Sequence, residues 1–363
     1  MVIVDDVLRE AGFSETAIAE VKAGKLHYGG SLDAASDKEL SVKLAFHVKA
    51  KLESAKEIFL DSPKKKEYDP TVESLGEFLS FSACLPVRMS RVVIAHCRDP
   101  YCLSPVMLFC FVATIGMIAV DGGLGSLEDF SGIKLTNEKV VGKLYRSAAP
   151  GSDLKLSKDE IPMFKDCKTH DEVENALRKV LLDRFRAYKR HGLDGIKPYA
   201  RSKKEFSPGE EMRSQIEAGG VLPKRSPIFN RYTLEYPDNA PEGAEESFFW
   251  VNSVIDGLPT IALVHRMGMP QSGGYVYLER HFYISRSHNW LQGIGCALPV
   301  DDGAVVLYCT RTSTDQVSGI GSTAKRKIGN KIMGGRMAEN FERAREVMAA
   351  AAAARDIEEL KGG

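Results

Sequence analysis

Several kinds of pattern are missing from this chain of 363 residues. There is no excess of either charge, since 49 basic residues balance 49 acidic ones, which argues against general nucleic-acid binding. No Cys-x-x-Cys pair occurs among the seven cysteines, which argues against a zinc ribbon or a thioredoxin-type site. The Walker, Gly-x-Ser-x-Gly and His-Glu-x-x-His motifs are also absent. We therefore expect no metal and no cofactor, and no motif fixes a reaction.

The first residues of the sequence do not resemble a cleaved secretory signal. Asp5 and Asp6 follow the first four residues directly, where a cleaved signal peptide would have a basic region and then an apolar stretch. We expect a cytoplasmic protein unless another segment spans a membrane.

Residues 78–122 are the one segment that could do so. Four of the seven cysteines lie here, and residues 103–120 are uncharged throughout. At roughly 1.5 Å per residue, that stretch has about the minimum length of a membrane-spanning helix. Three interpretations stay open: a single-pass membrane span over 103–120, a buried core element, or an insertion translated from non-coding sequence. The first would make the chain a membrane-anchored interaction protein.

Helical signals are present on both sides of this segment. Ser36-x-x-Glu39 matches a capping box ahead of apolar residues spaced by four, so residues 1–77 are predicted to form a helical lead-in. Residues 123–156 begin with a Gly/Ser-rich stretch and are predicted to be a linker. Two further helices are predicted to start at Thr169-x-x-Glu172, ending at Gly192, and at Ser207-Pro-Gly-Glu210.

The last third of the chain has the pattern of a β-meander. Asp256-Gly257 and Asp302-Gly303 each lie between β-rich runs, which is a strong hairpin signal. Two-residue turns at these sites would place Phe248 opposite His265 and Cys296 opposite Cys309. The predicted strands are 247–255, 258–268, 275–286, 290–300 and 304–312, with 229–236 as a further edge strand.

A long helix is predicted to close this meander. Beyond residue 311 the apolar period changes from two to 3.6, with an inward stripe at Val317, Ile320, Ala324, Ile328 and Ile332 and a cap among residues 312–314. The fold class is therefore α+β: a helical N-terminal part, then a five- to six-stranded antiparallel meander closed by a long C-terminal helix. The α+β domain would cover 157–350, and 351–363 would be a tail.

This layout resembles helix-grip folds that bind lipids and small ligands, and the resemblance is one of architecture alone. It implies an apolar cavity between a curved sheet and the helix, and hence a protein that binds a hydrophobic small molecule.

Two places on the predicted sheet carry candidate functional residues. Alternation along strand 275–286 puts Glu279, His281 and Tyr283 on one face. Turned inward, this row would be a general acid–base set, and the chain would be an enzyme acting on a small organic substrate. Turned outward, the row would be the solvated side of a half-buried sheet.

The second place is the corner between the last strand and the helix. Arg311, Thr312 and Ser313 would hold an anionic small molecule at the helix start, unless the hydroxyls simply cap the helix. His265 is a further candidate ligand contact, with a packed core histidine as the alternative. The basic run over 325–336 is expected to be a solvated face, with contact to anionic lipid as the alternative.

Overall fold

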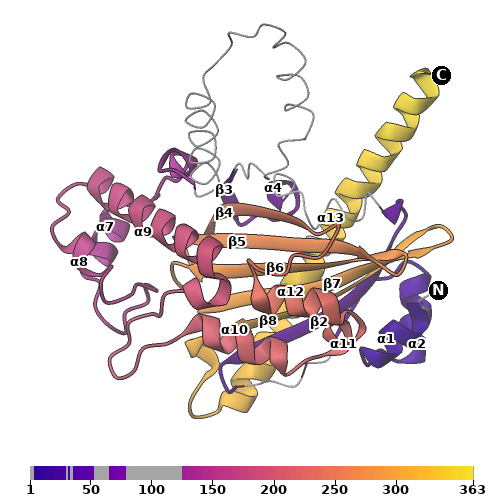
Figure 1. Ribbon diagram of the computed structural model, residues 1–363, viewed down its shortest axis with the longest axis horizontal. Helices are drawn as coiled ribbons and strands as arrows, with labels where there is room; N and C mark the ends of the chain where they lie inside the picture. Colours follow the sequence, from indigo (N-terminus) through magenta and orange to yellow (C-terminus); the bar gives the residue numbers. More distant parts are fainter. Residues whose placement is uncertain (1–3, 30–31, 33–35, 53–64, 79–124, 363) are drawn as a thin grey trace, which may run out of the picture.

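The computed structural model describes residues 4–29, 32, 36–52, 65–78 and 125–362. Those residues form an antiparallel sheet of eight strands with helices on both faces (Figure 1). The strands are β1 (His27–Gly29), β2 (Glu39–Val48), β3 (Val72–Glu77), β4 (Glu245–Ile255), β5 (Leu258–Gln271), β6 (Gly274–Ile284), β7 (Trp290–Val300) and β8 (Gly303–Ser313). The α+β prediction is confirmed, with eight strands in place of five to six.

Helices cover the sheet in two layers. Figure 1 shows α9 to α12 on one face and α13 crossing the other, and we call these the α9 face and the α13 face. The helices are α1 (Val4–Glu10), α2 (Glu15–Lys22), α4 (Lys65–Tyr68), α7 (Glu138–Arg146), α8 (Pro162–Lys165), α9 (His170–His191), α10 (Pro208–Glu217), α11 (Val221–Arg225), α12 (Pro227–Glu235) and α13 (Ser322–Gly362). Short 3₁₀ turns are η1 (Glu128–Phe130), η2 (Gly192–Gly195) and η3 (Asp315–Val317).

The strands β4 to β8 form the predicted meander, each pairing with the next. The turn at Asp256 and Gly257 has positive φ at both residues, and Phe248 pairs with His265 as expected. The pairing of Cys296 with Cys309 was wrong, because Cys296 pairs with Leu307. The loop is Asp301 and Asp302, one residue earlier than expected, and Gly303 already belongs to β8.

The prediction of a helix that begins at the Ser36 capping box was also wrong. Residues 39–48 form β2, which pairs with β8 along its whole length, so the segment expected to be a helical lead-in supplies β1, β2 and β3 to the sheet. Leu40, Leu44 and Val48 are spaced by four, and that spacing suits a strand as well as a helix. Val42 and Phe46 fill the alternate positions between them, which only the strand explains.

Residues 123–156 and 229–236 also differ from expectation. The described part of the predicted linker contains η1 and α7, and its Phe130, Ile133 and Tyr145 are buried in the core of the α9 face. The predicted edge strand is α12, opened by proline at its first turn. The helices at Thr169 and Ser207 are confirmed, and Thr169 makes both bonds of the capping box.

The closing helix is present, but it begins later and turns a different side inward. Gly319 and Gly321 adopt positive φ, which interrupts the chain after η3 and resets the helical phase. The predicted inward stripe was wrong at Ile320, Ala324, Ile328 and Ile332, which are all exposed, and right only at Val317, which is buried. Met337, Phe341 and Ala344 face the sheet in their place.

Close approach of α13 to the sheet depends on two glycines. A Cβ added at Gly329 would lie 2.9 Å from Leu40, and one added at Gly334 would lie 2.7 Å from Tyr28. A larger residue at either position would require the Leu40 or the Tyr28 side chain to move. The tail predicted for 351–363 is helical through residue 362.

Candidate functional site

The α13 face of the sheet holds a cavity of about 270 Å³. Its apolar wall comes from both layers, with Met333, Met337 and Phe341 contributed by α13 and Ala262 and Ile284 contributed by the sheet. The volume lies just below the range of about 300–1,000 Å³ that is typical of small-molecule sites in proteins. The expected arrangement of a cavity between sheet and helix is therefore present.

A buried ion cluster lies in the wall of this cavity. Glu279 Oε2 accepts hydrogen bonds from Arg266, at 2.8 Å from Nε, and its Oε1 accepts from Lys65 Nζ at 3.0 Å. Glu279 and Arg266 pair across β6 and β5, whereas Lys65 comes from α4. Burial by itself raises the pKa of Glu279, but Lys65 and Arg266 outweigh it and hold that pKa well below its usual range. Glu279 is thus an anion in the folded protein.

His281 is the third partner of Glu279. Its Nε2 lies 2.8 Å from Glu279 Oε1, while its Nδ1 is buried without a hydrogen-bond partner among the described residues. Burial lowers the pKa of His281, although Glu279 acts in the opposite direction, so the ring is neutral at pH 7. A neutral ring beside a carboxylate keeps its proton on Nε2. Nδ1 is then a hydrogen-bond acceptor without a donor.

Tyr283 does not join this pair, so the predicted row of three is wrong in its geometry. The pairing of β6 with β5 shifts between His281 and Tyr283, which is a β-bulge at Phe282. Phe282 and Tyr283 consequently both point to the α9 face, where the Tyr283 ring lies 4.3 Å from the guanidinium carbon of Arg184. Glu279 and His281 lie in the cavity wall, and Tyr283 lies on the other side of the sheet.

His265 also lies on the α9 face, away from the cavity. Its ring stacks on Phe248 with centroids 4.0 Å apart, its Nδ1 is 2.9 Å from the Tyr188 hydroxyl, and its Nε2 is 3.2 Å from Glu246. Tyr188 accepts from Arg280, so its one proton goes to His265 Nδ1, and His265 in turn donates from Nε2 to Glu246. Burial lowers the pKa of His265 to about 4. This is the geometry of a packed, hydrogen-bonded core histidine.

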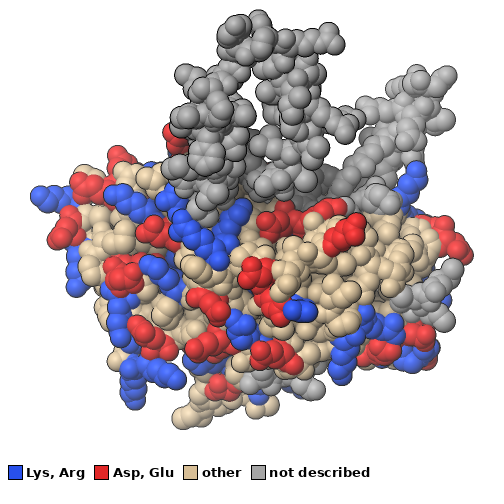
Figure 2. Space-filling model, viewed as in Figure 1, with Lys and Arg blue, Asp and Glu red and all other residues tan. Residues whose placement is uncertain are grey.

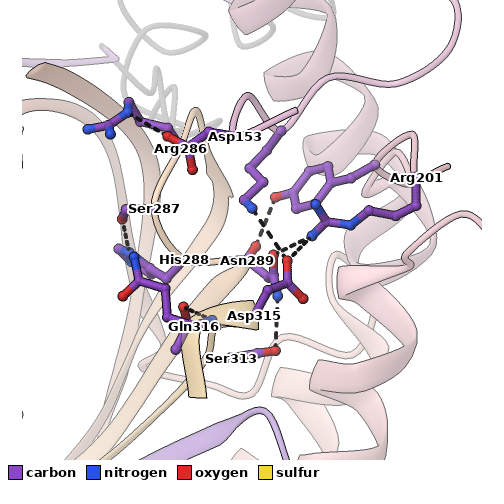
Figure 3. Close-up of polar contacts among 12 residues, drawn as sticks. Asp153, Arg201, Arg286, Ser287, His288, Asn289, Ser313, Asp315 and Gln316 are labelled. Carbon is purple, nitrogen blue, oxygen red and sulfur yellow. Dashed lines mark hydrogen bonds and ion pairs between the residues drawn. The ribbon is translucent and has the colours of Figure 1, made fainter. Parts of the chain in front are cut away.

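At the corner after β8, the carboxylate of Asp315 is surrounded by basic side chains. Asp315 lies 2.6 Å from Arg201, 3.1 Å from Lys38 and 3.7 Å from Lys155. Burial raises the pKa of Asp315, and Arg201 with these lysines outweighs that effect and lowers it. Figure 3 shows Arg201 reaching both Asp315 and Asn289, whose side chain in turn donates to Ser313.

The three candidates at this corner are already bonded within the chain. Arg311 forms an ion pair with Glu39, the Thr312 hydroxyl donates to the Trp290 carbonyl, and the Ser313 hydroxyl accepts from Asn289. An anionic ligand here stays a prediction, and these side chains would have to exchange their present partners to bind it.

Two members of the cavity cluster were missed from the sequence. Arg266 had a usable signal, because a two-residue turn at Ser272 and Gly273 places it opposite Glu279. Lys65 had none, since it comes from a four-residue helix far away in the sequence. His288 also lines the cavity, and its Nε2 is buried without a partner in the described part of the chain.

The predicted membrane span at 103–120 lies outside the described residues. Among the helices that the structure describes, none combines the length and the apolar character needed to cross a bilayer. The face drawn in Figure 2 shows acidic and basic side chains mixed over the surface.

Comparison with known proteins shows little similarity. No family model and no curated protein matches the chain. A solved structure titled "Crystal structure of Ara h 8.0201" is similar over 36% of this chain and 89% of that chain, with 11% sequence identity and a TM-score of 0.15. A TM-score this low carries no argument about function.

Proposed function

We propose that the protein binds a hydrophobic small molecule in the cavity between the sheet and α13. The observation that carries this proposal is the cavity of about 270 Å³, whose apolar wall is interrupted by the Glu279 cluster. Such a site combines an apolar surface, which favours transfer of the ligand from water, with a few fixed polar groups that orient it.

The polar groups narrow the class of ligand. Lys65 and Arg266 are both bonded to Glu279, so the carboxylate offsets one of the two positive charges in the wall. His281 Nδ1 still lacks a donor among the described residues. We infer a ligand that is largely apolar and carries one hydroxyl or amide N–H able to donate to this nitrogen.

The test is binding of the fluorescent dye 1-anilinonaphthalene-8-sulfonate to the full chain and to two matched variants. Ala262→Phe adds a large side chain at a residue that lines the cavity, and Ala240→Phe adds the same side chain at an exposed loop residue. We expect saturable dye binding by the wild type and by Ala240→Phe. Ala262→Phe should lose at least 10-fold in affinity. Equal binding by all three folded proteins would reject the cavity as the site.

A second candidate is an enzyme that uses Glu279 and His281. The observation that favours it is the carboxylate–imidazole pair itself, in which an anion orients a neutral base with a free lone pair. Such a base would activate a water molecule toward an ester. We expect wild type and Tyr283→Phe to hydrolyse p-nitrophenyl acetate alike and His281→Gln to be slower. Equal rates for all three would count against the enzyme.

A further inference from the structure

The outward side of the first half of α13 carries an unusual combination of residues. Ile328 and Ile332 are 61% and 53% exposed, and Ile320, in the loop just before the helix, is 99% exposed. Residues four apart on a helix are rotated by about 40°, so Ile328 and Ile332 form one apolar ridge. The ridge faces away from Met333 and Met337, which line the cavity beneath the helix.

Basic side chains border this ridge on both sides. By helical rotation, Lys325 and Arg336 lie on one flank and Lys327 and Lys331 on the other, and all four are exposed. No acidic residue occurs anywhere from 316 to 338. None of the four has an ion pair with any described residue, whereas Lys38, Lys155 and Arg311 do. The surface is therefore strongly positive around an apolar centre.

We propose that this surface, formed by Ile328, Ile332 and the four flanking cations, docks the protein on the surface of an anionic lipid bilayer. A bilayer can bind both kinds of side chain. Its acyl chains can bury the isoleucines, and its anionic headgroups can form ion pairs with the lysines. Nucleic acid would match the cations but would leave the isoleucines in water. A solvated face needs no isoleucine ridge at all.

The docking surface and the cavity lie on opposite sides of α13. The same helix turns Met333 and Met337 to the cavity and the isoleucines outward, so docking would bring the cavity within one helix diameter of the lipid, about 10 Å. Docking does not depend on the ligand proposal and can be tested without it.

The experiment is co-sedimentation of the full chain with vesicles of phosphatidylcholine, alone or mixed with phosphatidylserine. We expect binding to the mixed vesicles that is reversed by high salt, because screening weakens the headgroup contacts. Lys327→Gln/Lys331→Gln should weaken partition about 30-fold, since each lysine near such a surface contributes about 5-fold. Ile328→Ser/Ile332→Ser should weaken it by on the order of 10-fold or more.

Two matched controls decide whether the effect belongs to this surface. Lys203→Gln/Lys204→Gln removes two exposed lysines elsewhere, and Ile228→Ser removes an isoleucine that is 64% exposed on α12. Both should partition like the wild type. The proposal is overturned if the wild type stays in the supernatant with mixed vesicles, or if the controls lose as much binding as the α13 variants. All substituted side chains are exposed, so the variants should fold, and their thermal melting checks this.

Discussion

The two faces of the sheet bury histidines in different ways. On the α9 face, both ring nitrogens of His265 have partners, in a chain that runs from Arg280 through Tyr188 to Glu246. On the α13 face, His281 has one partner, Glu279, and its other nitrogen has none in the described part of the chain. Burial alone thus does not distinguish a packing histidine from a candidate functional one. The informative difference is the unused hydrogen-bonding capacity beside a cavity.

The same contrast applies to buried arginines. Arg280 is buried among neutral acceptors, namely Gln292, Tyr188 and the Thr233 carbonyl, which fix it within the packing of helices on strands. Arg266 is paired with a carboxylate that also bonds Lys65 and His281. Three cationic or donor groups therefore converge on one buried anion, whereas Arg280 has no carboxylate among these partners.

The largest expected effect comes from removing that anion. Glu279→Gln would leave Lys65 and Arg266 buried without their carboxylate, and breaking a buried ion pair costs about 3–5 kcal/mol of unfolding free energy. Urea denaturation measures the loss. Glu235→Gln, which removes the carboxylate of an exposed pair with Arg231, is the control and should leave the midpoint unchanged. Similar midpoints for both variants would show that the cluster is not a buried charge network.

The second-largest loss of stability is expected from a substitution on the α9 face. Tyr188→Phe removes the hydroxyl that joins Arg280 to His265. Arg280 Nη1 and His265 Nδ1 each lose a hydrogen bond in a buried position, so we expect a loss of about 1–3 kcal/mol. The same denaturation experiment measures it. Dye binding in the cavity should be unchanged, because Tyr188 lies on the opposite side of the sheet. A loss of dye binding would break the separation of the two faces.

A pH dependence follows from His265. Its pKa is about 4 in the folded chain, against about 6.5 when unfolded, so between these values the unfolded chain binds a proton that the native protein does not. Stability contributed by the neutral ring is therefore present above pH 6.5 and is lost as pH falls toward 4, by about 1.4 kcal/mol per pH unit. Denaturation at pH 6.5 and pH 5 measures the slope. In His265→Gln, the free energy of unfolding should fall less steeply with decreasing pH, by that amount. The same slope in the variant and the wild type would contradict the assignment.

The smallest expected effect is that of Tyr283→Phe. The Tyr283 hydroxyl is buried without a hydrogen-bond partner among the described residues, so its removal leaves no other group unpaired and should not lower the free energy of unfolding. Binding of the dye should not change either. A clear loss of binding would mean that the bulge does not separate Tyr283 from His281, and would restore the row predicted from alternation.

The sequence predicted the meander well because its signals are local. Turn chemistry at Asp256 and Gly257 sets the register of β4 on β5, and period-two alternation sets which side chains share a face. Both failures of register came from single residues. The Asp301 turn moved the β7–β8 pairing by two positions, and the bulge at Phe282 reversed the side of Tyr283.

The rest of the fold depends on contacts that no local pattern encodes. The pairing of β2 with β8 joins residues about 270 positions apart, and the capping-box pattern before β2 indicated a helix although the alternate apolar residues Val42 and Phe46 fit only a strand. The cavity cluster likewise needs Lys65 from a separate helix. Half of the site, Glu279 and His281, could be predicted from one strand, and the other half required the tertiary structure.

The central claim is that the space between the sheet and α13 holds a hydrophobic ligand. Native mass spectrometry of the purified full chain, compared with its mass after denaturation, tests it most directly. We predict a bound organic molecule on the wild type and on Ala240→Phe, released on denaturation, and none on Ala262→Phe. The same adduct on Ala262→Phe, or no adduct on any of them after incubation with a lipid extract, would contradict the account.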